Sequence, residues 1–266
     1  MDRRTFVRGA ATGVVGLAAG GAAGAAKVHH DVDTSPIPEQ RAFARMGDGS
    51  VRVVWSVDTA ERAVALTFDD GPHPDLTPAV LDLLAERGVQ ATFFLIGQSA
   101  RARPDLVARI VLEGHEVANH TDRHSTVVHL DGDQTRADVV DGAGSLEAVT
   151  GTVPRWFRAP RGMLNGAILR AAADLGHDVA MWSARVPILD GHATAAERAD
   201  RLMVDVAPGA IVLLHDGTSG REDDALEARR RGELPVLAAA LDRLASDGYR
   251  CVTLSELAAL ADPSES

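Results

Sequence analysis

The stretch VALTFDDGP at residues 64–72 decides the fold class, because a short apolar run ends there in two carboxylates and a turn. Its first five residues have the length and character of a buried strand. The Gly-Pro pair that closes it is typical of a turn. Asp69 and Asp70 at such a strand end point in different directions, so one can bind a metal ion while the other acts as a base. Taken alone, the same residues are equally compatible with an ordinary turn.

Six further apolar runs extend this pattern along the chain. Stretches with apolar residues at helical spacing separate them, for example at residues 76–84 and 234–244. A strand and a helix that alternate about seven times predict an α/β fold, a closed or nearly closed (β/α) barrel with about seven parallel strands. The further runs are at residues 91–96, 115–118, 155–158, 178–182, 210–214 and 250–253.

The bulk composition fits one catalytic domain, which we expect to span residues 51–266. With 266 residues and 45% hydrophobic content, the chain can bury one substantial core. The formal net charge of -11 excludes a nucleic-acid partner, since binding phosphates requires a basic face. The single cysteine, Cys251, excludes an internal disulfide and any metal site built on a pair of cysteines. We expect a monomer.

The first 26 residues have the layout of an export signal. Arg3 and Arg4 precede a weakly apolar stretch rich in Ala and Gly, and small residues at 23–25 suit cleavage. We interpret residues 1–26 as a twin-arginine signal, with a membrane anchor or a disordered tail as alternatives. Residues 27–50 are polar and unpatterned, which predicts a linker. The expected product is secreted or associated with the cell wall, without a stable membrane span after cleavage.

A second motif, NHTDRH at residues 119–124, follows the third apolar run. His120 and His124 are four residues apart, and on a helical turn this spacing places both imidazoles on one face, where they can hold a single ion. Two exposed histidines at this spacing also arise by chance. With Asp70, the set becomes one carboxylate and two imidazoles, which suits zinc or another borderline divalent ion and leaves positions open for water and substrate.

Two more strand ends carry polar groups, in FRAPRG at residues 157–162 and in LLHDG at residues 213–217. Catalytic residues collect at the carboxyl ends of barrel strands, so Arg158 and His215 are candidates. Each motif alone is a weak signal, because a histidine at a strand end is more often structural than catalytic.

Taken together and in this order, these motifs resemble those of the NodB-type polysaccharide deacetylases, the family-four carbohydrate esterases, over residues 61–260. The resemblance implies a distorted (β/α) barrel. It implies a metal-dependent hydrolase that removes acetyl groups, chiefly the N-acetyl groups of N-acetylglucosamine units, from a polysaccharide. It also implies that Asp70, His120 and His124 hold one divalent ion and that Asp69 is the general base. Zinc is the expected ion, with cobalt, nickel or manganese as alternatives.

The resemblance assigns further roles around the metal. Such an ion makes bound water more acidic, with a pKa near ~7. By the resemblance, Arg158 orients the base and His215 protonates the departing amine. The backbone N–H of Arg161 stabilises the oxygen that becomes negative. The other residues expected at the substrate and oxyanion site are Pro160, Trp182 and Leu213.

Two departures from the family pattern leave alternatives open. Arg161 stands where relatives usually have a tyrosine, so substrate preference is unsettled. Relatives commonly carry an Asp-Trp element that tunes the acid histidine, and here only Asp190 offers a shifted candidate. A glycan-binding protein of the same fold without turnover, an O-acetyl xylan esterase, and a barrel that hydrolyses a small cyclic amide are the alternatives. Candidate substrates are peptidoglycan, chitin-like oligomers and acetylated xylan.

Overall fold

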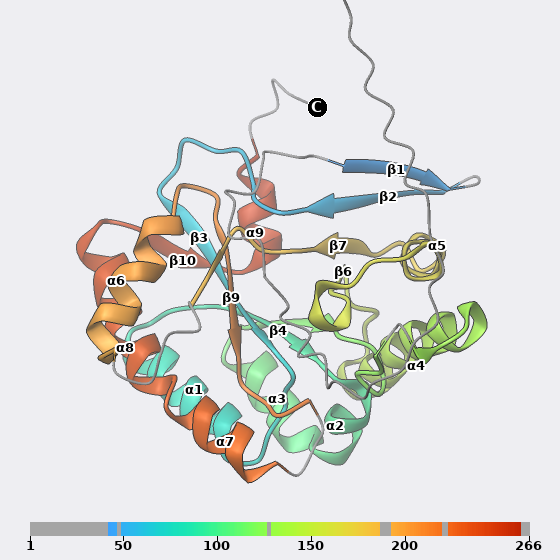
Figure 1. The fold of residues 1–266 in the computed structure, drawn as a ribbon, viewed down its shortest axis with the longest axis horizontal. Coiled ribbons are helices and arrows are strands. Elements are labelled where there is room, and N and C mark those ends of the chain that lie inside the picture. Colours follow the sequence, from blue (N-terminus) through green and yellow to red (C-terminus); the bar gives the residue numbers. More distant parts are fainter. Residues whose placement is uncertain (1–41, 47–48, 127–128, 187–192, 220–222, 262–266) are drawn as a thin grey trace, which may run out of the picture. The chain divides into compact units, whose positions relative to one another are not determined.

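Figure 1 shows the fold of the chain as a computed structural model, which describes residues 42–261 except 47–48, 127–128, 187–192 and 220–222. The predicted export signal lies outside the described residues, as does the first part of the predicted linker. Within the described ranges, no helix is both long and apolar enough to cross a membrane.

The described strands form one sheet in the order β1-β2-β7-β6-β5-β4-β3-β9-β8, and β10 also pairs with the start of β3. Only β1 runs antiparallel to its neighbour. The eight strands from β2 to β8 along this order are parallel and curl into a half-barrel. The strands are β1 (Ala42–Met46), β2 (Gly49–Val54), β3 (Ala63–Asp69), β4 (Thr92–Leu95), β5 (Glu116–Asn119), β6 (Trp156–Phe157), β7 (Asp178–Ala180), β8 (Ala184–Arg185), β9 (Ile211–His215) and β10 (Arg250–Val252).

Helices cover the sheet, and several begin at clear capping signals. Asp131 and Gln134 form a capping box at the start of α4, and Thr194 and Glu197 form one at the start of α6. Helix α1 contacts both α7 and α8 (Figure 1). The helices are α1 (Leu76–Glu86), α2 (Gly97–Ala102), α3 (Pro104–Leu112), α4 (Gly132–Thr150), α5 (Gly166–Asp174), α6 (Ala195–Asp205), α7 (Asp224–Arg231), α8 (Leu234–Ser246) and α9 (Leu254–Ala259).

The core lies between the sheet and these helices. Every residue of β3 and β4 is buried, as expected for parallel strands that are covered on both faces. Leu81 and Leu84 of α1 and Leu241 and Leu244 of α8 pack into the same apolar cluster as β3. Burial of such side chains contributes about 1.5–3 kcal/mol each, so the central strands are held firmly in place.

The predicted α/β fold with a parallel sheet is confirmed, and all seven predicted strands are present. The structure adds β1, β2 and β8, which the sequence pattern did not indicate. Strand β1 and the first residues of β2 occupy part of the 27–50 range that we expected to be a linker. Strand β8 has only two residues, too few to carry a periodic signal.

Strand register brings the sequence motifs together at the carboxyl edge of the sheet. Asp69 at the end of β3 lies opposite His215 at the end of β9. On the other side of β3, the end of β4 pairs with the end of β5. Asn119, the last residue of β5, lies opposite Phe157 at the end of β6. Four motifs that are far apart in the sequence therefore end at neighbouring positions.

Candidate metal centre and active site

Backbone strain gathers around this carboxyl edge. Five non-glycine residues of the described chain have positive φ angles, which L-residues rarely adopt. All five follow the ends of β3, β5, β6 and β9. Strain of this kind costs about 1–3 kcal/mol per residue and clusters at functional sites, where surrounding contacts hold it. The residues are Asp70 (φ 78°), Thr121 (66°), His124 (52°), Arg161 (59°) and Ser219 (58°).

Asp70, His120 and His124 form a cluster that can hold one divalent metal ion. Their ligand atoms all lie within 4.8 Å of one another. Asp70 Oδ1 is 3.1 Å from His124 Nε2 and 3.6 Å from His120 Nε2. The centroids of the two imidazole rings are 5.0 Å apart. All three side chains are almost completely buried, so the cluster is a built site and not a surface coincidence.

The two histidines converge by a different route from the one that their spacing predicts. The expected helical turn at His120 and His124 is wrong, because residues 120–124 form a loop in which Thr121 and His124 are left-handed. The loop follows directly on β5. With Thr121 and His124 in the left-handed region, both imidazoles face Asp70. The predicted convergence is present although the predicted local structure is not.

The charges and hydrogen bonds of the cluster fit a divalent ion. Burial would raise the pKa of Asp70, but His120 and His124 hold it well below its usual range, so the carboxylate is ionised. The His120 ring has Nδ1 at 2.8 Å from the Arg158 carbonyl oxygen. An Nδ1–H donor at this contact leaves the Nε2 lone pair facing Asp70, which is the usual arrangement of a metal-binding histidine. One ionised carboxylate and two imidazole nitrogens are suitable ligands for such an ion.

Hydrogen bonds from α4 and within the loop fix the backbone that carries the histidines. Asp138 of α4 accepts from the N–H groups of Arg123 (2.8 Å) and Ser125 (3.2 Å). Asn119 Oδ1 accepts from the Thr121 N–H at 2.9 Å, and Thr121 Oγ1 accepts from the His124 N–H at 3.0 Å. These bonds compensate for the strained φ angles and hold the loop in one conformation.

Gly142 of α4 provides a direct test of this arrangement. A Cβ at Gly142 would stand 2.5 Å from both Asn119 Oδ1 and the Thr121 carbonyl carbon, whereas a Cβ at Gly144, on the exposed face of α4, would meet open space. We expect Gly142→Ala to displace the loop, to weaken metal binding by about 10-fold or more and to cost about 1–3 kcal/mol of stability. Gly144→Ala should gain about 0.5–1 kcal/mol. Calorimetric titration measures the metal affinity of each variant, and urea unfolding measures its stability. Equal metal affinity in Gly142→Ala and Gly144→Ala would contradict the proposed contact between α4 and the loop.

Asp69 lies beside the cluster and is held by a buried arginine. Arg158 Nη1 donates to Asp69 Oδ1 at 2.7 Å and to Thr67 Oγ1 at 2.9 Å. Arg158 is fully buried, and its Nε and Nη2 donate to the carbonyl oxygens of Ala180 (3.1 Å) and Met181 (2.9 Å). The other carboxylate oxygen, Asp69 Oδ2, is 3.7 Å from His120 Nε2. One oxygen of Asp69 is thus fixed by Arg158, while the other faces the metal ligands.

His215 ends β9 beside Asp69, and Asp216 follows it directly. Burial and the nearby charge of Arg230 lower the pKa of His215 to about 4, although Asp69 and Asp70 act in the other direction. The imidazole is therefore neutral at neutral pH. Burial raises the pKa of Asp216 to about 7. The hydrogen bond that Thr77 Oγ1 donates to Asp216 Oδ2, 2.5 Å long, acts in the opposite direction and lowers this pKa. Asp190, the shifted candidate for tuning His215, lies outside the described residues.

The metal-ligand cluster, Asp69 and His215 line one hollow of about 190 Å³. It contains the metal-ligand cluster, the proposed base and the proposed acid, so a single substrate group can reach all of them. The lining residues are Asp69, Asp70, His120, His124, Arg161, Gly162, Trp182, Leu213, His215, Ser219 and Arg230.

Most residues predicted from sequence for the site lie at this hollow. Arg161, Trp182 and Leu213 line it, while Pro160 is buried in the short turn before Arg161 and does not. Arg158 does not line the hollow, but it donates a hydrogen bond to Asp69, which does.

Sequence reasoning missed Ser219 and Arg230 as lining residues. The side chain of Arg230 is only 10% exposed and lies against Asp70. Three consecutive arginines on a short helix do not reveal which one points inward, so no local pattern indicates this position.

Comparison with known proteins agrees with this geometry. The family model described as polysaccharide deacetylase matches residues 56–180. A peptidoglycan-N-acetylglucosamine deacetylase of Bacillus cereus is 36% identical over 77% of this chain and 92% of its own. A chitooligosaccharide deacetylase of Bradyrhizobium is 38% identical over 73% and 91%. A crystal structure of a peptidoglycan N-acetylglucosamine deacetylase superimposes with a TM-score of 0.69, at 29% identity over 77% of this chain and 92% of that one.

Proposed function

Because the chain belongs to the polysaccharide deacetylase family, we propose that it removes N-acetyl groups from N-acetylglucosamine-containing glycans of the cell wall or the extracellular space. One observation carries this proposal. A single hollow holds the Asp70, His120 and His124 cluster together with Asp69 and His215. A protein that only binds glycans has no need for a carboxylate and an imidazole beside a metal site.

Asp69 is the proposed general base. A divalent ion bound by Asp70, His120 and His124 supplies Lewis-acid chemistry, because it polarises the acetyl carbonyl and makes water more acidic. Asp69 Oδ2 faces the same space and takes the proton of the attacking water, while Arg158 donates to Oδ1 and holds the carboxylate in place. Arg158 is accordingly a positioning residue for the base.

The other residues of the hollow have proposed roles in binding and in departure of the amine. His215 is neutral at rest, so it first accepts the proton that Asp69 took from the attacking water and then donates it to the departing nitrogen. The backbone N–H of Arg161 is the proposed donor to the developing oxyanion. Trp182 and Leu213 form the proposed apolar wall of the acetyl pocket, with Pro160 supporting the turn that carries Arg161.

Zinc is the proposed metal ion. One carboxylate and two imidazoles leave open positions of the kind found in catalytic zinc sites. Cobalt, nickel and manganese suit the same ligands, so the ion that is available during folding decides occupancy.

We further propose that the chain is exported by the twin-arginine route and that residues 1–26 are its signal. Arg3 and Arg4 followed by a weakly apolar stretch support this location. A secreted or wall-associated enzyme would meet the glycans named above.

The experiment that tests the proposed function measures acetate release from defined substrates. The panel is N-acetylglucosamine oligomers, peptidoglycan and acetylated xylan, each treated with zinc-loaded protein. The proposal predicts acetate from the first two and little from xylan. Release from xylan alone would make the chain an O-acetyl esterase, and binding of glycan without any acetate would make it a binding protein.

A further inference from the structure

Helix α7 places a cation directly in the active-site hollow. Arg230 lines the hollow, and its side chain is nine-tenths buried. Its Nη2 is 3.4 Å from Asp70 Oδ2, and its Nη1 is 3.4 Å from Glu233 Oε2. Charge-assisted hydrogen bonds of this type are normally about 2.7–2.9 Å long. Both ion pairs are therefore longer than usual and correspondingly weak.

The two carboxylates nearest to Arg230 also interact with other groups. Glu233 is shared by three guanidinium groups, since it is also 3.8 Å from Arg229 Nε and 4.0 Å from Arg198 Nη2. Asp70 is shared as well, because its other oxygen faces the two metal-binding histidines. Asp70 and Glu233 therefore each interact with more than one partner, and neither is committed to Arg230 alone.

One edge of the Arg230 guanidinium, on the side of Nε and Nη2, lacks a close protein acceptor. The buried Nε of Arg230 has no hydrogen-bond partner within the described part of the chain, and Nη2 has only the long contact to Asp70. These two N–H groups form a fork that matches the two oxygens of a carboxylate. Arg161 lines the same hollow with an exposed side chain and adds a second positive charge.

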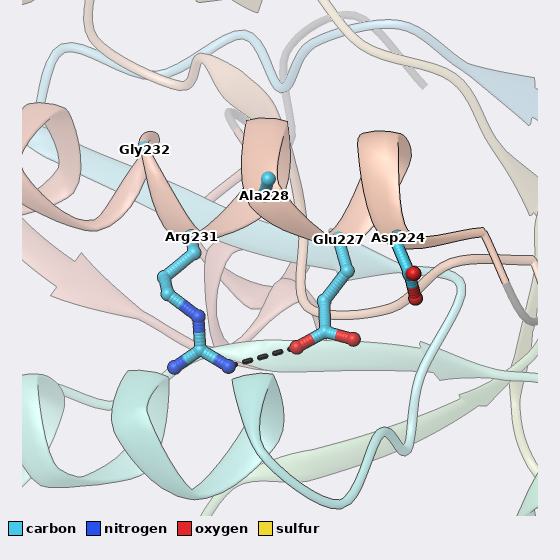
Figure 2. Close-up of a pocket in the computed structure, with 5 residues that line it drawn as sticks. All are labelled: Asp224, Glu227, Ala228, Arg231 and Gly232. Carbon is cyan, nitrogen blue, oxygen red and sulfur yellow. Dashed lines mark hydrogen bonds and ion pairs between the residues drawn. The ribbon is translucent and has the colours of Figure 1, made fainter.

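Arg231, the next residue on α7, is a natural contrast. Figure 2 shows its side chain directed toward Glu227 of the same helix. Arg231 Nη2 is 2.8 Å from Glu227 Oε1. Both residues line a separate surface hollow that contains none of the metal-ligand residues. The charge of Arg231 is neutralised locally and its side chain is 53% exposed.

We propose that Arg230 determines specificity by binding a carboxylate of the substrate, so that the enzyme prefers acidic N-acetylated glycans to neutral ones. The inference rests on the proposed deacetylase function and narrows its substrate class. Two carboxylates have the right chemistry: the lactyl ether group of N-acetylmuramic acid and the carboxylates of a peptide attached to it. Both belong to an acidic glycan, whereas an oligomer of N-acetylglucosamine carries neither.

The test compares each acidic substrate with its own neutral form. Substrates are an oligosaccharide of N-acetylglucosamine and N-acetylmuramic acid with free lactyl carboxylates, the same compound as its methyl ester, and peptide-bearing versions of both. The measured quantity is the ratio of kcat/KM for acid over ester. Loss of metal affinity in a variant would affect both substrates equally and cancels in this ratio.

We expect the wild-type ratio to be about 10 to 100, which corresponds to one charge-assisted bidentate contact. In Arg230→Gln the ratio should fall close to 1, while Arg231→Gln should keep the wild-type value. A preference for free lactyl carboxylates identifies that group as the ligand, and a preference that needs the peptide identifies the peptide carboxylate.

Equal rates on acid and ester in the wild type, or an unchanged ratio in Arg230→Gln, would overturn the inference. These outcomes differ from failure of the proposed function, in which no substrate of either kind releases acetate.

Discussion

Asp69→Asn is expected to lower acetate release by about 10²- to 10⁴-fold, the usual contribution of a positioned general base. The amide can still accept the hydrogen bond from Arg158, which is 2.7 Å long in the wild type, but it cannot take a proton at neutral pH. Because Asp69 is not one of the clustered metal ligands, metal binding should stay close to that of the wild type. The measurement is kcat at saturating metal.

The control for this variant separates chemistry from folding. Replacing Asp69 leaves the buried Arg158 without its charged partner, so some loss of stability is expected. Circular dichroism and calorimetric metal titration on the same samples show whether the protein is folded and loaded. A folded, metal-binding Asp69→Asn protein with more than a tenth of wild-type kcat would exclude Asp69 as the base.

Arg158→Met is expected to have the largest effect on stability. The wild-type guanidinium is fully buried and makes four hydrogen bonds, so its removal leaves the carboxylate of Asp69 and two carbonyl oxygens without their donor. Breaking a buried ion pair from one side costs about 3–5 kcal/mol. Urea unfolding measures this loss, and deacetylation should fall with it because Asp69 is no longer held.

Arg155→Met is the matched control, three residues away in the sequence. Arg155 is 45% exposed and its ion pair with Asp178 is 3.3 Å long, so the expected loss is below about 1 kcal/mol. If Arg158→Met were as stable as Arg155→Met, the buried network would not hold the site together as described.

The sequence predicted the parts of this molecule that repeat or that end a strand. Seven apolar runs alternate with helical stretches, and this alone indicates a parallel sheet. Because parallel strands end at one edge, the sequence predicts that Asp69, Asp70 and His215 lie near one another. The donor set of the metal site followed from residue types, and residue types do not depend on local conformation.

The remaining features depend on tertiary contacts that no local pattern records. The imidazoles of His120 and His124 converge through a strained loop, held by Asp138 of α4 and by side chains of the loop itself, and not through a helical turn. Arg230 differs from Arg231 in the direction that α7 gives its side chain, and the packing of α7 against α1 sets this direction. Strand β2 joins the sheet beside β7, more than a hundred residues away, through pairing that its composition does not signal.

A metal ion held by Asp70, His120 and His124 is expected to be required for deacetylation. The most direct measurement is a zinc titration of chelated protein in which bound metal and acetate release from N-acetylglucosamine oligomers or peptidoglycan are followed in the same samples. The account predicts no acetate from the chelated protein, recovery that is complete at one ion per chain, and no recovery in Asp70→Asn at the same metal concentration. Acetate release that persists in the chelated protein, or that Asp70→Asn shares with the wild type, would contradict it.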